Sequence, residues 1–196
     1  MGSTEKRWSQ WASPKYCELI RQAEDLLSID DVEGVKRLLV PLAALSEPAA
    51  LTILSRISHE SEPWESFVLR QRAQIEVAAE LGFPPAIYLL GLFYDEGENG
   101  YPIDRVRAAS LFREAAEKGH VQSQWIYALD LLNGRNGIAL DESLGHSYLL
   151  RAYDAGLQRA LESVADFYRR GVFGFEKSES LASAIYAKSE AAENWI

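Results

Sequence analysis

The stretch Pro85–Gly119 reads PAIYLLGLFYDEGENGYPIDRVRAASLFREAAEKG and shows how most of the chain is organised. Its pattern predicts a helix, a glycine-containing loop, a second helix and a terminal glycine. The outline returns at a constant interval of 37 residues, which we see in three glycine columns. These are Gly82, Gly119 and Gly156; Gly97, Gly134 and Gly171; and Gly100, Gly137 and Gly174. Three columns in register indicate an internal repeat.

Within each copy, small and bulky residues alternate in fixed columns. The first helices carry Ala86, Ser123 and Ala160, then Leu90, Tyr127 and Val164, then Gly91, Ala128 and Ala165; the second helices carry Ala108, Gly145 and Ala182. Small side chains let two helix backbones approach closely. Asp104, Asp141 and Ser178 stand where the second helix needs an N-cap. The pattern predicts an all-α array of stacked antiparallel helix pairs.

The spacing AxxxLGxxYxxG, then D, then AxxxFxxAAxxG resembles the Sel1-like repeat, a relative of the tetratricopeptide repeat. The matching residues of the first clear copy are Ala86, Leu90, Gly91, Tyr94, Gly97, Asp104, Ala108, Ala115, Ala116 and Gly119. The resemblance covers about residues 78–193 well and 48–77 weakly. It implies a right-handed superhelical solenoid that serves as a platform for binding other proteins, in a family with many bacterial members.

The domain organisation follows from where the repeat begins. We expect an N-terminal arm and capping helix pair over 1–47, then a repeat array over 48–196, with a degenerate copy at 48–82 and clear copies at 83–119, 120–156 and 157–196. Trp8 and Trp11 indicate one helical face or an arm that docks on the body. Pro41 should end or kink the second helix. Trp195 and Ile196 are expected to cover the open end of the stack.

Charge and composition narrow the choice of partner and compartment. The formal net charge is −9, and residues 51–100 hold eight acids against three bases. This balance argues against nucleic acid or an anionic membrane as the main partner. No apolar run reaches transmembrane length and no signal peptide is evident, so we expect a cytoplasmic protein. Cys17 is the only cysteine, which excludes an internal disulfide, and we interpret it as a small core residue.

The first helices are expected to line the concave face, by analogy with the related repeats. Their outward columns are Tyr88, Leu92 and Asp95; Trp125, Leu129 and Leu132; and Glu162, Asp166 and Arg169. An apolar centre with a charged flank is typical of a protein-binding site. The alternatives are that Trp125 belongs to the core or that the N-terminal arm covers the groove.

Asp130 stands in the column that holds Phe93 and Phe167 in the neighbouring copies. A carboxylate in a core column needs a partner or a route to water. One interpretation is that a local rotation leaves Asp130 at the surface. The other is a buried polar contact that fixes a ligand-facing helix.

A second candidate is an acidic edge formed by consecutive loops, with Glu60, Glu62, Glu65, Glu96 and Glu98. Such a patch speeds association with a basic partner. The alternative is a solvated edge that only aids solubility. The spacing does not match a calcium-binding loop.

The sequence carries no sign of catalysis, so we expect no catalytic residue, cofactor or metal. His59, His120 and His146 lack zinc-type spacing, and the glycines form no nucleotide-binding motif. We therefore expect a non-enzymatic protein-interaction module, whose partner has a basic surface and whose oligomeric state is open. The alternatives are a bacterial immunity protein that occludes a basic toxin, and an enzyme using paired carboxylates.

Overall fold

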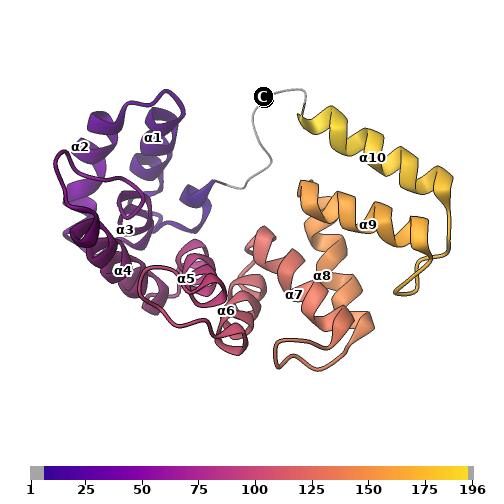
Figure 1. The fold of residues 1–196 in the computed structure, drawn as a ribbon. Coiled ribbons are helices and arrows are strands. Elements are labelled where there is room, and N and C mark those ends of the chain that lie inside the picture. Colours follow the sequence, from indigo (N-terminus) through magenta and orange to yellow (C-terminus); the bar gives the residue numbers. More distant parts are fainter. Residues whose placement is uncertain (1–6, 194–196) are drawn as a thin grey trace. The chain divides into compact units, whose positions relative to one another are not determined.

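A computed structural model describes residues 7–193 of the chain (Figure 1). These residues form ten α-helices and one 3-10 helix, with no strand among them, so the predicted all-helical fold is confirmed. The elements are η1 (Trp8–Trp11), α1 (Cys17–Ser28), α2 (Val32–Ala43), α3 (Pro48–Leu54), α4 (Trp64–Glu80), α5 (Pro84–Glu96), α6 (Arg105–Glu117), α7 (Val121–Asn133), α8 (Glu142–Asp154), α9 (Gln158–Arg170) and α10 (Glu179–Glu193). The expected cover by Trp195 and Ile196 lies outside the described residues.

The chain divides into two compact units between Lys118 and Gly119. The N-terminal unit comprises η1 to α6, and the C-terminal unit comprises α7 to α10. In the N-terminal unit, Ile20 of α1 and Leu39 of α2 share one core with Ile75 of α4 and Phe83. The first helix pair is thus packed on the degenerate copy through buried aliphatic side chains.

The N-terminal arm docks on the body of its unit. Trp8 and Trp11 lie in η1 and pack against the core, and the guanidinium of Arg56 lies 5.6 Å from the centre of the Trp8 ring. Helix α2 includes Pro41 and ends two residues after it, at Ala43. The expectation for Cys17 is wrong. Cys17 is exposed at the start of α1 and is not a core residue.

Each repeat is closed by the same main-chain hydrogen bond. The amide N–H at the N-cap of the second helix donates to a carbonyl near the end of the first helix. The three bonds join Asp104 to Tyr94 at 2.8 Å, Asp141 to Leu131 at 3.0 Å, and Ser178 to Tyr168 at 2.8 Å. We call this bond the repeat latch. It sets where the second helix begins in the three clear copies.

The predicted N-caps are confirmed. The Asp104 carboxylate accepts from the amide of Arg107, and the Asp141 carboxylate from that of Leu144, both at 2.9 Å. Ser178 Oγ accepts from the amide of Leu181 at 3.3 Å. These bonds satisfy helix amides that have no intrahelical partner.

Small residues hold the helices of a pair close together, as the repeat columns predict. A Cβ on Gly91 of α5 would lie 2.6 Å from Cε1 of Phe112 on α6. A Cβ on Gly145 of α8 would lie 2.8 Å from Cγ of Leu132 on α7. Both positions are therefore restricted to glycine by close approach.

Candidate functional site

One face of the C-terminal unit is built by α7 and α9, which a side-chain hydrogen bond joins. The indole Nε1 of Trp125 donates to Oγ of Ser163 at 2.9 Å. The guanidinium of Arg159 lies 5.5 Å from the centre of the Trp125 ring. The indole is half-buried, so part of its surface stays open to solvent. The tryptophan is thus held in place on both sides.

The neighbours of Trp125 on this face are an aliphatic residue and two acids. Leu129 follows one helical turn later on α7 and is half-buried. On α9, Glu162 is exposed and Asp166 is half-buried; Asp166 accepts from Arg170 at 3.1 Å. We call this surface, with Trp125, Leu129, Glu162, Ser163 and Asp166, the α7–α9 face. It combines an apolar centre with a charged flank, in which two acids lie on the same helix as Arg159 and Arg170.

Leu132 does not belong to this face. Its side chain is 1% exposed and packs against Gly145 of α8, so the expectation that it points outward is wrong. The physical reason is that Gly145 leaves a space beside α8 that only an inward side chain on α7 can fill.

The other predicted groove residues of the first helices lie in the N-terminal unit. Tyr88 and Leu92 are half-buried, and the ring of Tyr88 lies 5.9 Å from that of Phe112. The carboxylate of Asp95 lies 3.8 Å from Nε of Arg105. Tyr88 and Leu92 therefore present partial surface on α5 of the N-terminal unit.

Asp130 is buried, so the interpretation that placed it at the surface is wrong. It is 1% exposed, and its Oδ1 accepts from Nε of Arg135 at 2.7 Å and from Nδ2 of Asn136 at 3.0 Å. Both partners come from the loop that follows α7. The carboxylate holds that loop against the end of the helix, and the ion pair and amide bond compensate for its burial.

One residue of the expected acidic edge, Glu62, is neutralised by an ion pair. Glu62 is held by Arg70, whose Nε and Nη2 donate to its two oxygens, both at 2.8 Å. The Arg70 guanidinium, together with the backbone amide of His59, lowers the pKa of Glu62 to about 2. Arg70 also donates to the carbonyls of Leu54 and Ile57, so this pair ties the loop after α3 to α4. Glu62 is therefore a structural residue.

The remaining members of the edge are exposed and form no ion pair within residues 7–193. They are Glu60, Glu65, Glu96 and Glu98. The sequence did not predict the position of Arg72, whose guanidinium lies 4.2 Å from the centre of the Tyr101 ring. Tyr101 in turn donates to Glu76, so this arginine is fixed beside the loop that carries Glu98.

No metal-binding cluster is found in the described part of the chain. Within it, no three or more His, Cys, Asp and Glu side chains gather as metal ligands, and no helix could cross a membrane. His120 is a buried N-cap of α7, with Nδ1 3.4 Å from the amide of Ser123 and 3.0 Å from its hydroxyl. Burial lowers the pKa of His120 to about 4.

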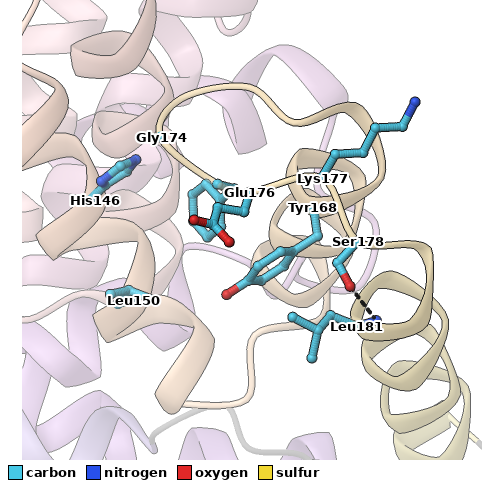
Figure 2. A pocket seen from close by; sticks show the side chains of 9 residues that line it. His146, Leu150, Tyr168, Gly174, Glu176, Lys177, Ser178 and Leu181 are labelled. Atoms are coloured by element: carbon cyan, nitrogen blue, oxygen red, sulfur yellow. Dashed lines mark hydrogen bonds between the residues drawn. The ribbon is translucent and has the colours of Figure 1, made fainter.

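A pocket that sequence reasoning missed lies in the C-terminal unit, between α8, the loop after α9 and the start of α10 (Figure 2). It has a volume of about 650 Å³ and is lined by His146, Leu150, Tyr168, Gly174, Phe175, Glu176, Lys177, Ser178 and Leu181. We call it the α8–α10 pocket. The available signal was the loop pair Phe173 and Phe175, which replaces Asn136 and Ile138 of the preceding copy.

Comparison with known proteins identifies the type of repeat in part of the chain. The Sel1 repeat model matches residues 84–120 and 121–157. The chain is 31% identical over 98 residues to chitin synthase regulatory factor 3 of Schizosaccharomyces pombe, covering 50% of this chain and 10% of that protein. It is 29% identical over 171 residues to the chitin synthase regulator SKT5 of Saccharomyces cerevisiae, covering 83% and 24%. The chain thus spans a tenth to a quarter of the length of these relatives.

Two solved structures share the fold. A Sel1 repeat protein from Oxalobacter formigenes aligns with a TM-score of 0.68 at 21% identity, over 81% of this chain and 64% of that one. The protein c5321, a protective antigen of uropathogenic Escherichia coli, aligns with a TM-score of 0.66 at 24% identity, over 79% and 32%. Residues 84–157 are therefore two Sel1 repeats, and the chain has the all-helical fold of the Sel1-repeat proteins.

Proposed function

We propose that the chain is a non-enzymatic module that binds another polypeptide on its α7–α9 face. The observation that carries this proposal is the preorganised Trp125, held by Ser163 and Arg159 while part of its ring stays open. Tryptophan is strongly enriched among the residues that dominate binding energy. A rotamer that is fixed before binding loses little entropy on association.

The sequence relatives agree with a binding role. Both are named as regulators of chitin synthase, and a regulator can act by contact with the enzyme or its partners. Because the chain spans a small part of each, the likeness supports a shared module and leaves the partner of this chain to experiment.

We further propose that a basic partner is favoured. Glu60, Glu65, Glu96 and Glu98 are exposed acids of the N-terminal unit, and Glu162 is an exposed acid on α9. Charges of one sign on a surface raise the association rate with an opposite charge, and added salt weakens the effect.

The test is affinity capture with Trp125→Ala, using Trp64→Ala as the matched control. Trp64 is 68% exposed and lies on α4 of the other unit. The proposal predicts that captured partner falls about tenfold with the first change and is unaltered with the second, at equal helical circular dichroism. Equal capture by both variants contradicts it. Very tight capture of a single basic toxin would instead favour the immunity protein.

A further inference from the structure

The α8–α10 pocket is a mixed site with aromatic and aliphatic walls. The rings of Tyr168 and Phe175 meet edge to face at 5.0 Å, and the ring of His146 meets that of Phe175 at 5.1 Å. His146 is fixed by its ring Nε2, which contacts the carbonyl of Phe173. Leu150 and Leu181 line the pocket from α8 and α10 and are 45% and 48% exposed. The wall is therefore largely preformed.

Two polar groups of this pocket are unused. The hydroxyl of Tyr168 and the carboxylate of Glu176 have no hydrogen-bond or ion-pair partner within residues 7–193. Figure 2 shows both groups directed toward α8, whereas the side chain of Lys177 extends away from the other labelled side chains. The pocket thus presents a carboxylate and a hydroxyl against aromatic faces.

The same unit shows which group such rings accept. Four of its aromatic rings each carry a cation: Arg159 over Trp125, Arg151 over Tyr148, Arg169 over Tyr186 and Lys188 over Tyr153. Within residues 7–193, no cation lies over Tyr168 or Phe175. Stacking of a cation on an aromatic ring is favourable even at a partly exposed site.

We propose that the α8–α10 pocket takes an arginine side chain of a partner polypeptide. The planar guanidinium pairs with the Glu176 carboxylate, donates a hydrogen bond to the hydroxyl oxygen of Tyr168, and stacks on the aromatic wall. The methylene stem lies along Leu150 and Leu181. The volume of about 650 Å³ accommodates this side chain with flanking backbone. This inference rests on the proposed protein-binding function and names one feature of its partner.

The test is a nuclear magnetic resonance titration of the full chain with N-acetyl-arginine amide. The neutral control is N-acetyl-citrulline amide, which has nearly the same shape without the charge. The arginine compound should shift the amides of Gly174, Phe175 and Glu176 in a saturable manner at millimolar concentration. The citrulline compound should bind at least about tenfold more weakly, because it lacks the ion pair.

Protein variants separate the pocket from a general charge effect. Glu176→Gln should weaken binding about tenfold and Tyr168→Phe about threefold, whereas Glu179→Gln, whose carboxylate lies outside the pocket, should leave it unchanged. Equal binding of citrulline, equal loss with Glu179→Gln, or no shift at the pocket overturns the proposal. The titration needs no partner and does not involve Trp125, so its failure is distinct from failure of the α7–α9 face.

Discussion

The indole of Trp125 and the hydroxyl of Ser163 are joined by a hydrogen bond of 2.9 Å that links α7 to α9. This bond keeps the candidate hot-spot residue in one rotamer. The bond also means that Trp125 contributes to the stability of the fold. This contribution must be measured before any binding result for a Trp125 variant is interpreted. The Ser163 hydroxyl itself donates to the carbonyl of Arg159, so it is oriented by its own helix.

We predict that Ser163→Ala lowers the free energy of unfolding by about 1 kcal/mol, because it removes the acceptor of the indole N–H. Ser110→Ala is the control, since Ser110 is an exposed helical serine and reports the gain in helix propensity alone. Urea denaturation of both variants gives the difference. Equal stability of the two would mean that the Trp125 bond contributes nothing.

Gly91→Ala should destabilise the N-terminal unit by roughly 1–3 kcal/mol, because the new methyl would lie 2.6 Å from the ring of Phe112. The next copy carries Ala128 and Leu149 at the corresponding positions. The double change of Gly91→Ala with Phe112→Leu should therefore cost less than the two single changes together. A double-mutant cycle by thermal and urea unfolding measures this coupling, and strict additivity would refute it.

We predict that Glu62 makes the free energy of unfolding depend on pH in the acid range. Its folded pKa of about 2 lies below the ordinary 4.5, so the unfolded chain binds the proton more readily. The stabilising contribution is complete above pH 4.5 and is lost as the pH falls toward 2. Glu62→Gln should flatten the unfolding free energy over that window. A variant whose profile matches that of the parent would show that the Arg70 pair does not control it.

His120 should act in a higher pH window. Its folded pKa of about 4 lies below the ordinary 6.5, because burial disfavours the charged ring. Stability is complete above pH 6.5 and decreases as the pH falls toward 4, by up to about 3 kcal/mol. His120→Asn keeps an N-cap side chain and should remove this slope. Glu62→Gln, as the control, should retain it.

Much of the fold could be predicted because the repeat states the same geometry several times. The N-caps Asp104 and Asp141 and the close approach at Gly91 all follow from residues at fixed offsets. Asp130 shows that position in the repeat can decide whether a residue is buried, even when its side chain is charged. It occupies the column of the buried Phe93 and Phe167, and it is buried as they are.

The candidate site was harder to predict because it depends on contacts between elements. Leu132 faces inward because Gly145 on another helix leaves room for it. Glu62 forms an ion pair with Arg70, eight positions later in the chain. Gly145 stands in a column that holds alanine in the other two copies, and Arg70 is not fixed by the repeat pattern. The same holds for the α8–α10 pocket, which arises where Phe175 packs on His146 and Tyr168.

The repeat latch is a bond between main-chain atoms alone. Its acceptors are the main-chain carbonyls of Tyr94, Leu131 and Tyr168, so it does not depend on the side chains of those residues. A Sel1 hairpin can thus exchange the side chain at this position without losing its closure. The last copy shows this, because the backbone of Tyr168 closes the hairpin while its phenol ring lines the α8–α10 pocket. Variation at this single column offers a route by which one scaffold acquires new partners.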